Sequence, residues 1–200
     1  VQWDEALKRD AAGRKKELSE EIGWIESRRG DMLGFWSKVE EGTIPTRVTH
    51  NDTKINNILF DRQGEVLCAI DLDTVMASTS LNDFGDAIRS YANTGDEDDR
   101  DLSRVGLSLE MFRAYTEGYL SQRAKQLTDS EIDHLAFSTR YITFEQVLRF
   151  LMDYIDGDTY YKIKYPEHNL VRTKAQFKLL QSAEAAIPKM KAYIKECLGK

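Results

Sequence analysis

The 200-residue sequence is poor in the residues that build disulfide frameworks and metal clusters. It contains two cysteines, Cys68 and Cys197, and three widely separated histidines. Two cysteines are too few for the disulfide scaffold of a small secreted domain, and scattered histidines do not supply a zinc cluster. Because this cysteine usage is typical of a reducing compartment, we expect a cytoplasmic protein.

The sequence also lacks a hydrophobic run of membrane-spanning length, and no charged-then-apolar signal segment opens it. Its formal net charge of −6 makes general affinity for nucleic acid unexpected. The proportions of hydrophobic residues (41%) and charged residues (31%) are typical of a soluble globular chain. Two hundred residues suffice for one sizeable domain, or for one lobe of a larger protein.

Two classes of hydrolase require a nucleophile motif that is missing from the sequence. There is no Gly-x-Ser-x-Gly elbow, and neither cysteine is followed by the Pro and Arg of a sulfatase nucleophile motif. Acyl transfer and sulfate-ester hydrolysis are therefore disfavoured.

Two short motifs carry most of the functional information. The first begins at His50, with Asp52 two residues later and Asn57 five residues after that. This is the catalytic-loop spacing of eukaryotic-type kinases, in which the Asp accepts the proton of the substrate hydroxyl and the Asn holds magnesium. The second motif, Ala-Ile-Asp-Leu-Asp-Thr at residues 69–74, places Asp71 at the end of an apolar run, where it would supply the other half of a metal site.

The chain between the two motifs is predicted to form a β-hairpin, because two apolar runs flank turn-forming residues at 61–64. A tight register would place Asn57 opposite Cys68 and Asp71 opposite Lys54. The motif residues should then gather at the open end of the hairpin. Carboxylate and amide oxygens suit magnesium, so we expect a metal site there.

The remaining sequence predicts helices from its apolar periodicity and its capping residues. We expect helices at about residues 3–29 and 32–39, a helix capped by Asp83, a helix over 111–126, a helix opened by the capping box of Thr128 and Glu131 and ended by Gly157, and a last helix from about Asn169 that Pro188 kinks or breaks.

A mostly helical body with one embedded hairpin resembles the C-terminal lobe of the aminoglycoside phosphotransferase and choline kinase superfamily. Residues 48–57 and 70–75 look most like N-acetylhexosamine 1-kinases, as do residues 83–86 and 165–172. Typical aminoglycoside kinases instead read His-Gly-Asp-Leu-His-Pro-Gly-Asn and Ile-Asp-Trp. The resemblance implies a mainly α fold with a small β-hairpin, the C-terminal lobe of a protein-kinase-like (α+β) fold. It also implies ATP- and magnesium-dependent phosphorylation of a small-molecule hydroxyl, specifically the anomeric hydroxyl of an N-acetylhexosamine.

Carried over by matching position, the resemblance makes Asp52 the catalytic base and Asn57 and Asp71 the magnesium ligands. His50 would be structural. Lys54 lies where protein kinases place a lysine near the transferred phosphoryl group, which makes it a nucleotide-side candidate; a plain surface lysine is the alternative.

Three further positions have two readings each. Asp83 matches a family Asp that braces the catalytic loop. Asp73 would contact a sugar hydroxyl or the metal, or is an exposed turn residue. Arg172 is poorly placed for the helix dipole near the start of the last helix, which suggests a substrate-side role, although a surface arginine would also fit.

The sequence departs from the family before His50, where no glycine-rich strand-turn-strand and no Val-Ala-Ile-Lys-like strand occurs. We therefore expect residues 1–200 to form the C-terminal catalytic and substrate-binding lobe, to lack the N-terminal nucleotide-clamping lobe and to be inactive alone. Two alternatives stay open: a kinase of the same superfamily that acts on an aminoglycoside or amino alcohol, and a non-catalytic binding module.

Overall fold

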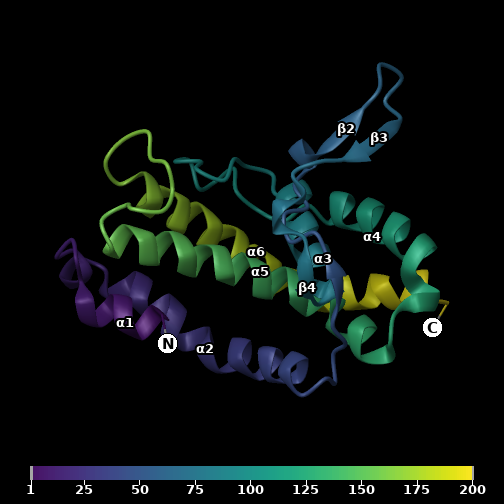
Figure 1. The fold of residues 1–200 in the computed structure, drawn as a ribbon, viewed down its shortest axis with the longest axis horizontal. Helices are drawn as coiled ribbons and strands as arrows, with labels where there is room; N and C mark the ends of the chain where they lie inside the picture. Colours follow the sequence, from purple (N-terminus) through teal and green to yellow (C-terminus); the bar gives the residue numbers. More distant parts are fainter. Residues whose placement is uncertain (1, 200) are drawn as a thin grey trace.

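The computed structural model describes residues 2–199 as a helical body from which one hairpin projects (Figure 1). The helices are α1 (Gln2–Arg9), α2 (Ser19–Glu40), α3 (Ser80–Tyr91), α4 (Leu109–Arg123), α5 (Asp129–Ile155) and α6 (His168–Cys197), and the strands are β1 (Arg47–Thr49), β2 (Ile58–Phe60), β3 (Val66–Ala69) and β4 (Met76–Ser78). Short 3₁₀ turns lie at Lys15–Glu17, Ile55–Asn57, Leu72–Thr74 and Ala124–Gln126. The prediction of a mainly α chain with a small hairpin is confirmed.

The body is organised around α5 and α6, which pack antiparallel along most of their length (Figure 1). Arg140 of α5 donates through Nε to Glu184 of α6 at 2.8 Å, which joins the two helices at mid-length. One hydrophobic cluster packs α1 and α2 against α5 and α6, and a second packs α3 and α4 against them. Within residues 2–199, no helix combines the length and the apolar character needed to cross a membrane.

The predicted division of the N-terminal helices is wrong. Instead of one helix over residues 3–29, α1 ends at Arg9, and the backbone then takes positive φ angles at Asp10 (41°) and Gly13 (67°). Left-handed residues end a helix because they turn the chain out of the helical path. α2 then runs without a break through Gly30, since packing against α5 offsets the low helix propensity of glycine.

Three other helix predictions have different outcomes. The capping box that opens α5 is confirmed, because Thr128 and Glu131 exchange side-chain-to-backbone hydrogen bonds. The predicted cap of α3 is wrong: the Thr79 side chain accepts from the backbone of the first turn, and Asp83 lies inside that turn. α6 also continues through Pro188 to Cys197 and is not broken there.

The chain around the hairpin forms two small antiparallel sheets, β1 with β4 and β2 with β3. The predicted hairpin register is wrong, because Leu59 pairs with Cys68 and a bulge follows before the next pair. Asp61 accepts from two backbone amides of the turn, which holds a wider connection than a tight turn would allow. As a result Asn57 lies opposite Ile70, whose amide it accepts at 2.8 Å.

Glu131 joins three segments at the base of the sheet of β1 and β4. Its fully buried carboxylate accepts from Arg47 Nε at 2.6 Å and from Ser80 Oγ at 2.7 Å, besides the backbone of Thr128. Burial alone would raise its pKa, but these hydrogen bonds outweigh burial and lower the pKa to about 2. The starts of β1, α3 and α5 are thereby held together by one charged group.

Close approach of α3 to α5 depends on Gly85. A Cβ atom at this position would lie 2.4 Å from the backbone oxygen of Ser138 and 2.8 Å from Cγ1 of Ile142. Only a residue without a side chain therefore lets α3 pack at this distance from α5. The fully buried Phe84 and Ile88 on either side complete the contact.

We expect Gly85→Ala to destabilise the fold by about 1–3 kcal/mol, the usual cost of inserting a methyl group into a packed interior. The matched control is Gly34→Ala in α2, where a Cβ atom would meet no atom within 4 Å. Because alanine is the better helix former, the control should be stabilised by up to about 1 kcal/mol. Urea unfolding of both variants measures the difference, and equal midpoints would contradict this account of Gly85.

Candidate active site

The segment that carries the first motif is held by hydrogen bonds to the N-terminal half of α3. The backbone amides of His50 and Asn51 donate to the two carboxylate oxygens of Asp83, at 3.0 and 2.7 Å. Asn51 has a φ of 61°, a left-handed conformation that asparagine tolerates better than most residues. Asp83 therefore braces the loop, the role that the resemblance implied for it.

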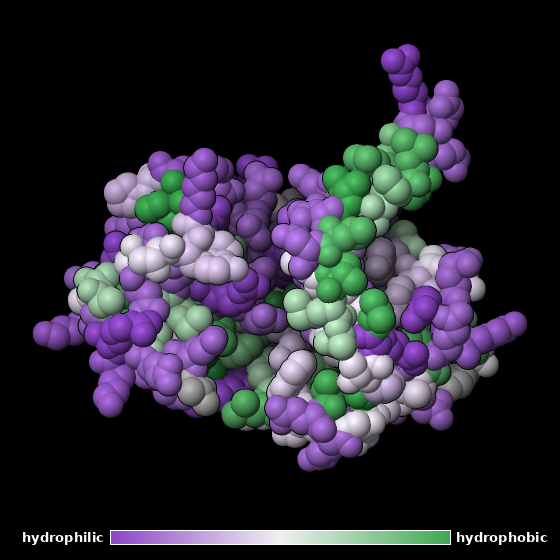
Figure 2. All heavy atoms as spheres, viewed as in Figure 1, coloured by the Kyte–Doolittle hydropathy of each residue, from purple (hydrophilic) through white to green (hydrophobic). Residues whose placement is uncertain are grey.

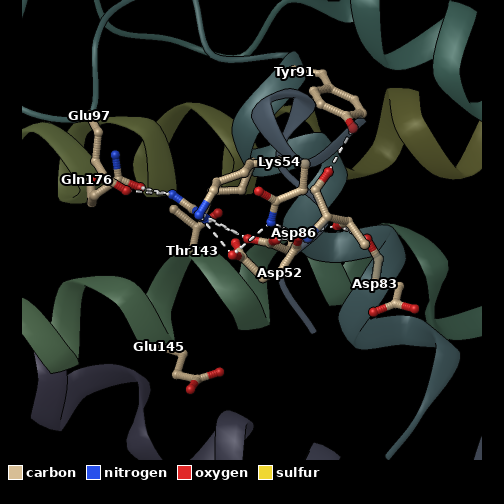
Figure 3. Close-up of polar contacts among 12 residues, drawn as sticks. Asp52, Lys54, Asp83, Asp86, Tyr91, Glu97, Thr143, Glu145 and Gln176 are labelled. Atoms are coloured by element: carbon tan, nitrogen blue, oxygen red, sulfur yellow. Dashed lines mark hydrogen bonds and ion pairs between the residues drawn. The ribbon is translucent and has the colours of Figure 1, made fainter. Parts of the chain in front are cut away.

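Asp52 is oriented by two neighbours in the same loop, as Figure 3 shows for its contact with Lys54. Lys54 Nζ donates to Asp52 Oδ2 at 2.7 Å, and Asn57 Nδ2 donates to the same oxygen at 2.9 Å. Burial raises the pKa of Asp52, but the hydrogen bonds from Lys54 and Asn57 outweigh burial and lower it overall. No donor among residues 2–199 reaches Oδ1, so an ionised oxygen is left to accept a proton from a ligand.

The position of Asp71 is set by contacts between the catalytic loop and Ile70, the residue before Asp71. The amide of Ile70 donates to the carbonyl of Asn57 at 2.8 Å, and His50 Nε2 lies 3.0 Å from the carbonyl of Ile70. Asp71 itself has a φ of 62° and a ψ of 57°, a left-handed conformation that is uncommon for aspartate. The second motif is thus tied to the first although the hairpin register differs from the prediction.

Negative charge gathers on the exposed side of this turn. A hydrogen bond to Asp73 and the charge of Asp73 raise the pKa of Asp71, while the charge of Lys54 opposes the shift. Two carboxylates this close favour either a shared proton or a bound cation. Asp73, a substrate candidate, lies beside the candidate metal ligand in the exposed 3₁₀ turn.

The donor set fits one magnesium ion better than a metal held by protein alone. Asn57 uses its Nδ2 for Asp52, which leaves its Oδ1 for a cation beside the carboxylate of Asp71. Among residues 2–199 there is no group of three or more His, Cys, Asp or Glu that could hold a metal. Magnesium is commonly bound through one or two protein oxygens, with phosphate oxygens and waters as the other ligands.

A pocket of about 600 Å³ lies between α1, the C-terminal half of α5 and the segment that follows α5. Glu145 lines it and lies beneath Asp52 in the view of Figure 3. Burial raises the pKa of Glu145, and the charge of Asp86 on α3 raises it further.

The aromatic wall of the pocket is held rigidly. The buried carboxylate of Asp153 accepts the backbone amides of Thr159, Tyr160 and Tyr161, at 2.9, 2.8 and 3.0 Å. The guanidinium of Arg149 lies 5.8 and 5.6 Å from the two tyrosine ring centroids. The buried Tyr161 hydroxyl has no hydrogen-bond partner among residues 2–199. The sequence prediction missed this pocket, and a pair of tyrosines that begins three residues after Gly157 was its one visible signal.

Arg172, the other substrate candidate, lies apart from the pocket lining. It donates through Nη1 to Asn169 Oδ1 at 3.0 Å, and its guanidinium lies 5.3 Å from the ring centroid of Phe150. Phe150 in turn packs against Tyr161, at 4.8 Å between ring centroids. Arg172 therefore supports the aromatic wall from behind, and contact with a ligand remains a prediction.

Comparison with protein families supports the same interpretation of the loop as its geometry does. Residues 2–124 match the model of the phosphotransferase enzyme family (APH). The match includes the catalytic loop, the hairpin, α3 and α4, and it spans more than half of the chain. The resemblance to the aminoglycoside phosphotransferase superfamily is confirmed at this level, and the chain belongs to the phosphotransferase enzyme family.

Proposed function

We propose that the protein is an ATP- and magnesium-dependent kinase that phosphorylates a hydroxyl group of a small molecule, with an N-acetylhexosamine as the acceptor. The observation that carries this proposal is the arrangement of Asp52. One of its oxygens is fixed by Lys54 and Asn57, and the other is free of donors among residues 2–199.

In this proposal Asp52 Oδ1 accepts the hydrogen bond of the acceptor hydroxyl. It then accepts the proton as the hydroxyl oxygen bonds to the γ-phosphorus of ATP, the bond from that phosphorus to the bridging oxygen breaks, and ADP leaves. The lowered pKa keeps Asp52 ionised at neutral pH, so that it aligns the hydroxyl before transfer. Lys54 offsets negative charge near the transferred group. Asn57 and Asp71 would hold magnesium, which supplies charge neutralisation of the phosphates when bound.

We propose that the nucleotide binds on the side of the site where the hairpin projects. Figure 2 shows hydrophobic residues gathered along the hairpin and the segment that joins it to the body, with a hydrophilic tip. The exposed side chains include Leu59, Phe60, Val66 and Leu67. Exposed apolar patches of this kind mark interaction surfaces. We propose that a nucleotide-clamping lobe covers them and that residues 1–200 form the catalytic and acceptor-binding lobe. Dependence on ATP and two free cysteines favour the cytoplasm.

The pocket between α1 and α5 is the proposed acceptor site. Aromatic faces with a few placed polar groups are typical of small-molecule sites, and here Tyr160, Tyr161 and Arg149 supply both. A polycationic aminoglycoside would need several free carboxylates. Asp153 is already bound to backbone amides and Asp156 to Arg9. Of the carboxylates that line the pocket, this leaves Glu5 and Glu145, which are few for a polycation, and so favours an uncharged sugar.

A non-catalytic module has less support than a kinase. The candidate base keeps an unoccupied oxygen, and both candidate metal ligands are present at the same end of the hairpin. A kinase acting on an amino alcohol remains the second candidate, because Glu145 in the pocket would pair with a single ammonium group.

Asp52→Asn in the intact protein should lower kcat at least about a hundredfold, because asparagine cannot accept the proton, while ATP binding stays nearly unchanged. The comparison variant is Lys54→Met. Removing Lys54 takes away the hydrogen bond that lowers the pKa of Asp52, so the acid limb of the kcat/KM profile should move to higher pH. Turnover close to that of the unmodified protein in Asp52→Asn would remove Asp52 from the mechanism.

Asn57→Ala and Asp71→Ala should each raise the magnesium concentration required for half-maximal turnover by about tenfold or more, because each removes one of two protein ligands. Glu65→Ala, which removes an exposed carboxylate from the same hairpin, is the matched control. Titration of activity with magnesium distinguishes the three variants. An unchanged magnesium dependence in both site variants would place the metal elsewhere.

Tyr160→Ala should raise KM for the acceptor about tenfold and leave KM for ATP unchanged, because the exposed ring contributes to the acceptor pocket alone. A panel of N-acetylhexosamines, aminoglycosides and amino alcohols identifies the acceptor class. Tyr193→Ala, on the distant part of α6, controls for loss of an aromatic side chain. An equal effect of the two substitutions would argue against an acceptor site in this pocket.

A further inference from the structure

We propose that Asp86, Arg89 and Tyr91 of α3 are positioning residues for catalysis, acting through Thr53. Thr53 is the residue between the candidate base Asp52 and the candidate phosphoryl-side cation Lys54. The inference rests on the proposed function, because it needs Asp52 to act as the base.

Every polar group of Thr53 is bonded to α3. Its amide donates to Asp86 Oδ2 at 2.8 Å, and its carbonyl accepts from the Tyr91 hydroxyl at 2.6 Å. Its own hydroxyl donates to the carbonyl of Asp83 at 2.9 Å. Figure 3 shows these groups converging from α3 on the loop. The peptide groups on both sides of Thr53 are thereby fixed, and with them the directions in which the Asp52 and Lys54 side chains leave the backbone.

Arg89 keeps Asp86 in the orientation that this requires. Its Nε and Nη2 donate to Asp86 Oδ1 at 3.1 and 2.9 Å, so that Oδ2 remains for the amide of Thr53. Arg89 is buried, with 7% of its surface exposed, and its rigid planar guanidinium directs both donors at one oxygen of Asp86. Glu97 accepts from the remaining Nη1 at 3.0 Å.

The two carboxylates of α3 divide the loop between them. Asp83 accepts the amides of the two residues before Asp52, and Asp86 accepts the amide of the residue after it. Asp52 is thus held on both sides, although neither helix residue contacts its carboxylate. Proton acceptance depends steeply on geometry, and misplacement of a reacting group by about 1 Å can cost a hundredfold in rate.

The test uses Tyr91→Phe and Arg89→Lys in the intact protein. Tyr91→Phe removes a single oxygen and should lower kcat about tenfold, and Arg89→Lys should lower it about a hundredfold, because lysine cannot donate to Asp86 Oδ1 from two nitrogens of one rigid plane. KM for ATP and for the acceptor should change less than about twofold, since binding contacts are retained. Amide hydrogen exchange over residues 50–57 should become faster in both variants, a change that loss of global stability alone would spread over the chain.

The matched control is Arg140→Lys, which changes another arginine that donates through two nitrogens, to Glu184 of α6 and to Asp31 of α2, away from the loop. If Tyr91→Phe and Arg89→Lys turn over as fast as this control, the inference is overturned. If Arg89→Lys does not fold, Tyr91→Phe decides alone. Asp52→Asn is measured beside them. If Asp52→Asn is inactive while Tyr91→Phe and Arg89→Lys remain fully active, only this inference is overturned. If Asp52→Asn is active, the proposed function is overturned as well.

Discussion

The catalytic loop depends on hydrogen bonds between its backbone amides and two carboxylates of α3. Asp83 and Asp86 lie one helical turn apart and accept amides on either side of Asp52. Buried amides must be paired, and carboxylates pair them more strongly than neutral acceptors do. The position of the loop is therefore set by the position of α3. That position in turn is fixed by the close packing on α5 that Gly85 permits and by the buried carboxylate of Glu131.

The pKa values of Asp52 and Asp71 are shifted in opposite directions, which suits phosphoryl transfer. Asp52 has a lowered pKa because Lys54 and Asn57 stabilise its charge more than burial disfavours it. Asp71 has a raised pKa because Asp73 shares its exposed turn. One carboxylate is thus satisfied by the protein, while a proton or a bound cation would relieve the repulsion at the other. A base must stay ionised and oriented, whereas a metal ligand gains its full stabilisation only when the metal binds.

How much of this could be read from the sequence differs with the range of the interactions. The spacing within one loop predicted the kinase family, because Asp52 and Asn57 are too close in sequence to be separated by the fold. The prediction of the hairpin register was wrong because Asp61 holds a wide turn, next to a bulge in the strands. Apolar patterning does not encode this side-chain effect. The break after α1 was not predicted, because the helical spacing of apolar residues continues across Asp10. The backbone, in contrast, turns out of the helix there.

The pocket was invisible to sequence patterns for a different reason. Its walls come from α1, from the C-terminal half of α5 and from the tyrosine segment, and they meet only through long-range contacts such as that of Arg9 with Asp156. No local spacing records such an arrangement. Glu145 of α5 lines the pocket, and the charge of Asp86 on α3 contributes to its raised pKa. Because α5 carries residues of the pocket and also packs against α3, which holds the catalytic loop, this interface influences the position of both. A change at this interface would therefore move the pocket and the catalytic loop together.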